Sequence, residues 1–202
     1  MENFRVIPVG MLAVNCYLVL DEAAERLFVV DPGDDADLIV AAAREMSHRE
    51  AVILLTHAHV DHIGAVPEVA SALNVKTVWL APGDVPMYRS PSNNLLPYLS
   101  TVAGLPPTVS EWPWSDPELL STPGHSRGGS CFYFRSRKIL LSGDTLFAGS
   151  VGRTDFPGGD FAMLEQGIRE KILTLPDEVR VYPGHGPATT VGAERRSNPY
   201  LV

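Results

Sequence analysis

The stretch AVILLTHAHVDH, residues 51–62, is the densest concentration of reactive side chains in the chain. Its first five residues form a short apolar run, which is more typical of a buried strand than of a helix. Metal-binding side chains follow on the loop expected at the C-terminal end of that strand: His57, His59, Asp61 and His62. In an extended segment alternate residues share one side, and a turn at Asp61 brings His62 round to the others. Neutral imidazoles beside an ionised carboxylate predict a divalent-cation site rather than a polar loop that is merely rich in histidine.

Composition limits the classes of protein to consider. With 202 residues, 45% of them hydrophobic, the chain can build a substantial core, and we expect a single domain over residues 1–202. No apolar run is long enough to span a membrane and residues 1–10 lack the features of a secretory signal, so we expect a cytoplasmic protein with no membrane partner. Cys16 and Cys131 lie in strand-like stretches and are expected as buried thiols. The net charge of −8 argues against nucleic acid as a partner but admits a small anionic substrate.

Hydrophobic periodicity predicts the strands and helices. Strands are expected at residues 4–9, 15–20, 26–30, 51–55, 76–80, 118–121, 130–135, 138–141 and 179–182. Helices are expected from a cap at Asp34 or Asp35 to about residue 46, over 63–73 and over 161–173. Residues 81–117 are rich in Pro, Ser and Asn, so we expect little regular structure there and a role as the wall or cover of a pocket. Trp112 and Trp114 in this segment either pack beneath the loop or stack on a substrate.

Three further candidate ligands lie beside glycines at the ends of expected strands. They are His125 in TPGHS, Asp144 in SGDT and His185 in YPGHG. Glycine lets the backbone turn sharply there, so that each side chain can point across a strand edge. Added to the first loop, they make five histidines and two aspartates. That number exceeds the four ligands of a tetrahedral zinc site and fits two adjacent ions that share one carboxylate.

The order of the expected elements indicates the fold class. Strands, a helix and a strand follow one another in the first half of the chain and again in the second. This order predicts an α/β protein in which two mixed sheets pack face to face with helices outside, a four-layer α/β/β/α sandwich.

Four motifs, taken in order, resemble those of the metallo-β-lactamase superfamily: THAHVDH at 56–62, PGH at 123–125, SGD at 142–144 and PGHG at 183–186. Residues 143–160, GDTLFAGSVGRTDFPGGD, and 182–201, YPGHGPATTVGAERRSNPYL, are most similar to the glyoxalase II group, the hydroxyacylglutathione hydrolases, and especially to its short single-domain bacterial members. The resemblance extends over nearly the whole chain. It implies the metallo-β-lactamase fold and a metal-dependent hydrolase.

The resemblance also implies how the ligands are shared between two metals. The first metal is held by His57, His59 and His125, the second by Asp61, His62 and His185, and both by Asp144.

Three other positions receive supporting roles. Asp31 matches an acidic residue that supports the metal loop from the end of an early strand. Asp61 is expected to orient reactants as well as to bind metal, with a share in proton handling. Arg153 is the candidate for contact with the substrate, and the alternative is a surface arginine bonded within its own loop.

The expected reaction is the hydrolysis of a thioester such as S-lactoylglutathione. Two divalent ions, zinc first with iron or manganese as alternatives, can hold a water between them and lower its pKa enough to supply hydroxide at neutral pH. The hydroxide attacks the carbonyl carbon, and a thiolate then leaves without needing a strong acid. The expected partner is therefore a small-molecule thioester, a glutathione conjugate.

Other functions stay open on the sequence alone. GRTDF at 152–156 is also a pattern of the related persulfide dioxygenases, which bind one non-haem iron. Lactonase or phosphodiesterase chemistry can use the same metal pair, since one scaffold often hosts several reactions. A non-catalytic metal-binding protein is the non-enzymatic alternative, and the presence of all seven ligands argues against it.

Overall fold

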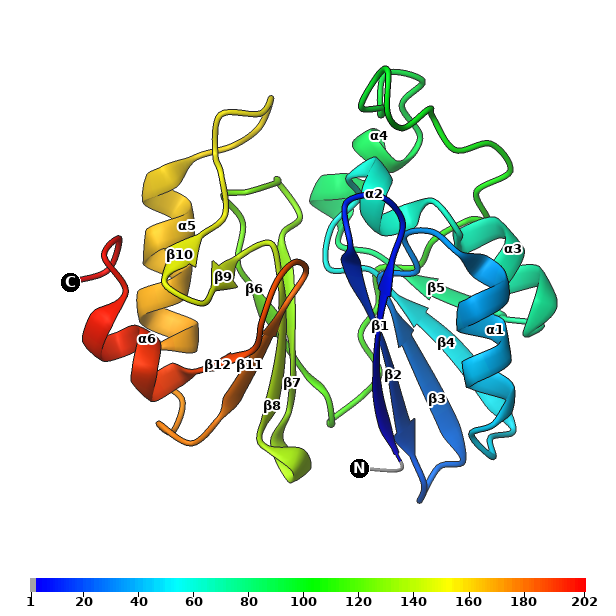
Figure 1. Ribbon diagram of the computed structural model, residues 1–202, viewed down its shortest axis with the longest axis horizontal. Helices are drawn as coiled ribbons and strands as arrows, with labels where there is room; N and C mark the ends of the chain where they lie inside the picture. The colour runs from blue at the N-terminus through cyan, green and yellow to red at the C-terminus, as the bar shows by residue number, and fades with distance from the viewer. Residues whose placement is uncertain (1–2) are drawn as a thin grey trace. The chain divides into compact units, whose positions relative to one another are not determined.

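The computed structural model describes residues 3–202, which form two compact units. The first unit runs to Leu80 and takes in Val85–Glu111, and the second comprises Ala81–Asp84 and Trp112–Val202. Each unit carries a five-stranded mixed sheet with helices (Figure 1). The expected α/β class with two mixed sheets is therefore confirmed. The expectation of one domain over residues 1–202 stays a prediction.

The sheet of the first unit joins an antiparallel half to a parallel half. Its strands, in sheet order, are β1 (Phe4–Val9), β2 (Val14–Asp21), β3 (Arg26–Val30), β4 (Glu50–Leu54) and β5 (Thr77–Trp79). β1, β2 and β3 are antiparallel neighbours, whereas β3, β4 and β5 are parallel. Val30 pairs with Leu54, so the segments that leave β3 and β4 emerge side by side at one edge of the sheet. In open α/β sheets this is the edge where functional groups gather.

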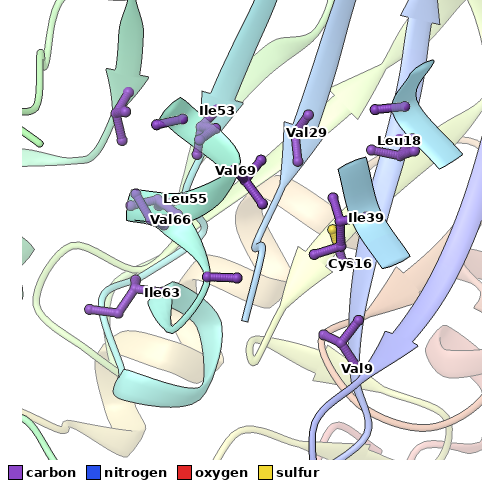
Figure 2. Close-up of a cluster of buried hydrophobic side chains, with 14 of the residues drawn as sticks. Val9, Cys16, Leu18, Val29, Ile39, Ile53, Leu55, Ile63, Val66 and Val69 are labelled. Carbon is purple, nitrogen blue, oxygen red and sulfur yellow. The ribbon is translucent and has the colours of Figure 1, made fainter. Parts of the chain in front are cut away.

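Helices α1 (Ala36–Arg44) and α3 (Val66–Ala72) pack against each other beside this sheet (Figure 1). Their apolar sides close a core with the strands. Figure 2 shows Ile39 of α1 and Val69 of α3 among strand residues such as Leu18. Cys16 lies in the same core, where burial raises the pKa of its thiol above the ordinary value and keeps it protonated.

The sheet of the second unit is also mixed. Its strands, in sheet order, are β12 (Thr189–Thr190), β11 (Arg180–Pro183), β8 (Ile139–Gly143), β7 (Ser130–Phe134) and β6 (Glu118–Ser121). Only β11 and β8 are parallel to each other. Helix α5 (Phe161–Gly167) continues into the π-helical turn η3 (Ile168–Ile172), and Leu164 and Ile168 pack into the core of this sheet.

Most expected elements are present within one to three residues, but the helix expected over 63–73 is two helices. The chain forms α2 (Val60–Ile63), breaks, and resumes as α3. At the break the Ala65 N–H donates to Pro32 O at 3.0 Å instead of to a carbonyl of its own helix. A long-range hydrogen bond of this kind leaves no trace in the hydrophobic pattern.

The expected cap of the first helix is also wrong in its chemistry. Asp35 occupies the N-cap position of α1, but its side chain makes no capping bond. Instead, its carboxylate accepts from the Gly10 N–H at 2.8 Å. The residue therefore ties the β1–β2 turn to the start of the helix.

Within residues 3–202, five elements are present that the pattern did not predict. They are α4 (Val85–Tyr88), β9 (Leu146–Phe147), β10 (Ser150–Val151), β12 and α6 (Val191–Ser197), besides the 3₁₀ turns η1 (Pro82–Asp84) and η2 (Arg135–Arg137). Most are shorter than the periods that reveal a helix or strand. None of the helices in residues 3–202 is long and apolar enough to cross a membrane.

Neighbouring residues on α1 test the core. Ile39 is fully buried, whereas the adjacent Leu38 is 54% exposed. We expect Ile39→Ala to lower the free energy of unfolding by about 2–5 kcal/mol, because it leaves a cavity. The matched change Leu38→Ala should cost less than about 1 kcal/mol. Urea titrations measure both, and equal losses would contradict the assignment of the buried face.

Candidate metal centre

The first unit brings four of the predicted ligands together where β4 ends. His57 and His59 lie on the loop, as expected, while the turn that follows is the one-turn helix α2, which carries Asp61 and His62. A ring nitrogen of His57 lies within 4.8 Å of one in His59 and of one in His62. Asp61 Oδ2 lies 3.8 Å from His62 Nε2. The clustering predicted within this loop is therefore present.

Asp31 stands behind this loop as the hydrogen-bond acceptor for three donors. It follows β3, is 1% exposed, and accepts from the Thr56 N–H at 2.8 Å and the Thr56 hydroxyl at 2.6 Å. His62 Nδ1 lies 3.0 Å from the same carboxylate. A buried carboxylate needs donors of this kind to replace its water. Asp31 thus holds the backbone and the side chains of the histidine loop in one arrangement.

This network determines where the imidazoles carry their protons. His62 donates its Nδ1–H to Asp31. The Thr56 hydroxyl gives its hydrogen to Asp31, so it accepts from His57 Nδ1, 3.0 Å away. In both rings the Nε2 lone pair is then available for a metal, because a neutral imidazole carries its proton on one nitrogen only.

A glycine allows the Asp61 backbone to approach the segment after β3. A Cβ atom at Gly33 would lie 1.9 Å from Asp61 O, which no side chain could tolerate. Gly64 makes a matching approach, since its Cβ would lie 2.1 Å from Gly33 O. Any larger residue at position 33 or 64 would collide with a backbone oxygen. Helix α2 therefore packs closely against the turn that carries Asp31.

The second unit brings the other three predicted ligands together. His125 follows β6, Asp144 follows β8 and His185 follows β11. Asp144 Oδ2 lies 3.6 Å from His125 Nε2 and 3.7 Å from His185 Nε2. The carboxylate therefore stands between the two imidazoles, as a shared ligand would.

His125 is oriented by a main-chain atom of the glycine-rich loop. Its Nδ1 lies 2.7 Å from Arg153 O and donates to it, which leaves the lone pair on Nε2 toward Asp144. Gly152 makes this loop fit, because a Cβ there would lie 1.9 Å from Asp144 O. The loop after β8 therefore folds back against Asp144, the residue with which it begins.

The Arg153 side chain is engaged within its own loop. Its guanidinium binds Asp155 through two hydrogen bonds of 2.7 and 2.6 Å and lies 4.1 Å from the centre of the Phe156 ring. The hydrogen bond from Arg153 lowers the pKa of Asp155 to about 2, so the pair stays charged at neutral pH. The contacts match the alternative reading of a loop-bonded arginine, and contact with substrate stays a prediction.

The donor set fits divalent cations. Ligands about 2.0–2.2 Å from one tetrahedral ion lie roughly 3.3–3.6 Å from one another. The three carboxylate-to-imidazole distances, 3.6, 3.7 and 3.8 Å, are close to that spacing and too long for direct hydrogen bonds. Imidazole and carboxylate together suit zinc, iron or manganese.

Sequence reasoning missed two residues beside these ligands. Thr56 links His57 to Asp31, and the parallel pairing of β3 with β4 is the signal that could have found it. Asn93 donates from its side-chain amide to Ala58 O at 2.7 Å, between the first two histidines. No local pattern predicts that contact, because 35 residues separate the partners.

The tryptophans of the proline-rich segment pack rather than point to a ligand. Trp112 stacks on Phe132 with ring centres 5.5 Å apart and meets Trp114 edge to face at 4.8 Å. The first of the two roles considered for them therefore accounts for their contacts. Cys131 is buried in the second unit and Cys16 in the first, and both are thiols, as expected.

Sequence comparison relates the chain to a known family. Residues 9–185 match the family described as the metallo-beta-lactamase superfamily. The chain is 34% identical to hydroxyacylglutathione hydrolase GloC of Haemophilus influenzae, over 98% of each chain.

Two solved structures share the fold. The crystal structure of TTHA1623 in a di-iron-bound form has a TM-score of 0.87 and 38% identity, over 98% of this chain and 100% of that one. The crystal structure of the BLEG-1 B3 metallo-beta-lactamase has a TM-score of 0.85 and 36% identity, over 98% and 99%.

The Thr56 hydroxyl offers a test of the network. We expect Thr56→Val, which removes the acceptor for His57 and a donor to Asp31, to lower the free energy of unfolding by about 1–3 kcal/mol. Thr56→Ser keeps the hydroxyl and should cost less. Chemical denaturation of the metal-free protein compares them, and a Val variant as stable as the Ser variant would show that the hydroxyl does not support the loop.

Proposed function

The chain belongs to the metallo-β-lactamase superfamily, and from this premise we propose that it is a metal-dependent hydrolase of thioesters. The observation that carries the proposal is the set of imidazoles whose Nδ1 atoms are bonded to Asp31, Thr56 and Arg153 O. Two of these rings present Nε2 to a carboxylate: His62 Nε2 lies 3.8 Å from Asp61 Oδ2, and His125 Nε2 lies 3.6 Å from Asp144 Oδ2. Such an arrangement serves metal binding and has no comparable use in a merely structural loop.

We further propose that the seven residues form one binuclear centre. The first ion would be held by His57, His59 and His125, the second by Asp61, His62 and His185, with Asp144 shared. Support comes from the family pattern and from the position of Asp144 Oδ2 between two imidazoles. Zinc is our first choice of metal, with iron next because the relative TTHA1623 binds two irons.

The residues around the proposed centre then have defined roles. The bound cations would supply a hydroxide nucleophile at neutral pH and polarise the carbonyl group of the substrate. Asp61, fixed by the close approach of Gly33, orients the reactants and shares in proton handling. Asp31 holds the imidazole tautomers. The leaving thiolate needs no strong acid, because the pKa of a thiol is already low.

The proposed substrate is a thioester of glutathione, such as S-lactoylglutathione. Support comes from the similarity to a hydroxyacylglutathione hydrolase over nearly the full length of both chains. We place the reaction in the cytoplasm, where the buried thiols of Cys16 and Cys131 would stay reduced.

A second candidate is a persulfide dioxygenase that uses one non-haem iron. GRTDF at residues 152–156 favours it, because the related dioxygenases share this pattern. Metal content and oxygen consumption with glutathione persulfide distinguish the two. One iron per chain with oxygen uptake would replace the hydrolase proposal.

Removal of metal tests the hydrolase directly. Exhaustive chelation should abolish cleavage of S-lactoylglutathione, and added zinc, iron or manganese should restore it. His59→Ala should lose at least about 100-fold in kcat/KM, because a ligand is missing. The matched change His48→Ala removes a histidine outside the centre and should leave the rate unchanged. Full activity of metal-stripped protein or of the His59 variant would place the centre elsewhere.

Asp31 can be tested separately from the ligands. Asp31→Asn removes the negative charge that orients His62, so we expect metal affinity to fall about 10–100-fold. Asp37→Asn makes the same chemical change at an exposed position of α1 and serves as control. Competition against a chromophoric chelator measures both. Equal affinities would show that Asp31 serves folding alone.

A further inference from the structure

The first unit contains a cavity of about 550 Å³ in the proline-rich segment. Tyr88, at the end of α4 (Figure 1), forms part of its lining together with Arg89, Ser90, Thr101 and Leu105. The volume falls in the range of small-molecule sites, about 300–1,000 Å³. Nothing in the proposed metal centre requires a cavity at this place.

Hydrogen bonds within the segment join residues that line the cavity. The Tyr88 hydroxyl donates to Pro106 O at 3.1 Å, and the Thr101 hydroxyl donates to Pro91 O at 2.8 Å. The partners in these bonds are 18 and 10 residues apart in the chain. Prolines contribute further rigidity, because their φ angles are fixed. A ligand would therefore meet a largely preformed site.

The charge of the lining selects the ligand. Among the residues that line the cavity, one is cationic, Arg89, and none is acidic. Within residues 3–202 the Arg89 guanidinium makes no salt bridge, unlike Arg153 or Arg195. A carboxylate is the natural partner of an exposed guanidinium beside apolar walls.

The cavity lies next to the histidine loop. Ser90 on its rim and Asn93 are the two ends of one turn, closed by the Asn93 N–H and Ser90 O at 3.1 Å. The Cα atoms across such a turn lie within about 7 Å of each other. Asn93 in turn donates to Ala58 O, between His57 and His59. The segment that lines the cavity and the histidine loop are therefore joined through Asn93.

We propose that this cavity holds the carboxylate-bearing peptide part of the thioester substrate, with Arg89 as the residue that binds a carboxylate. The inference rests on the proposed thioesterase, whose substrate is a peptide-like anionic thiol. The thioester carbonyl then lies at the metal centre while the peptide occupies the cavity.

Two substrates and two arginines form the kinetic test. S-lactoylglutathione carries carboxylates, and the S-lactoyl thioester of N-acetylcysteamine has the same acyl group without them. In Arg89→Ala we expect the preference for the anionic substrate, a ratio of kcat/KM values, to fall about 10-fold through KM. Arg89→Lys should retain part of it. Arg44→Ala removes an exposed arginine from α1 and should leave the preference unchanged.

Direct binding separates this inference from the proposed reaction. Calorimetry of metal-loaded protein with S-methylglutathione, which has no thioester to cleave, should show affinity about 10-fold weaker in Arg89→Ala. If the protein binds S-methylglutathione through Arg89 but cleaves no thioester, the assignment of the cavity holds and the thioesterase proposal is wrong. If wild type and Arg89→Ala cleave S-lactoylglutathione with the same KM, the thioesterase proposal holds and the assignment of the cavity is wrong. Equal affinity for S-methylglutathione in wild type and variant, or none in either, also overturns the assignment of the cavity.

Discussion

The buried carboxylate of Asp31 is the constraint on which the histidine cluster of the first unit depends. It lies at the end of β3, beside the end of the parallel strand β4, and accepts from Thr56 twice and from His62 once. Those bonds fix the histidine loop and the proton positions of two imidazoles at the same time. The parallel pairing of β3 with β4 therefore places Asp31 beside the histidine loop, because parallel neighbours deliver their following loops to the same edge.

The two units orient their imidazoles through different kinds of atom. In the first, side chains orient the imidazoles, through Asp31 and Thr56. In the second, a backbone carbonyl orients His125. Both units set a glycine against the main chain of an aspartate ligand, Gly33 at Asp61 and Gly152 at Asp144. In each unit the missing Cβ atom lets the glycine approach the backbone of its aspartate, which limits how far that backbone can move.

Much of the fold could be predicted from the sequence, because apolar runs mark buried strands. The strands at 4–9, 26–30 and 118–121 have the expected bounds. The candidate metal ligands were recognisable by their density and by the glycines beside them, and the structure gathers His57, His59, Asp61 and His62 within the first unit and His125, Asp144 and His185 within the second. The wrong predictions fall where a hydrogen bond to a residue far away in the sequence determines the local structure. Asp35 bonds to Gly10 and Ala65 bonds to Pro32 in this way. Thr56, Asn93 and the Arg89 cavity also depend on contacts across many residues.

The orientation of His125 by a main-chain oxygen has a consequence for variation at position 153. A carbonyl is the same in every amino acid, so the identity of the side chain at 153 is uncoupled from the imidazole it supports. The side chain instead projects into a small charged and aromatic cluster with Asp155 and Phe156. The side chain at position 153 can therefore vary while the main-chain hydrogen bond that orients His125 is kept.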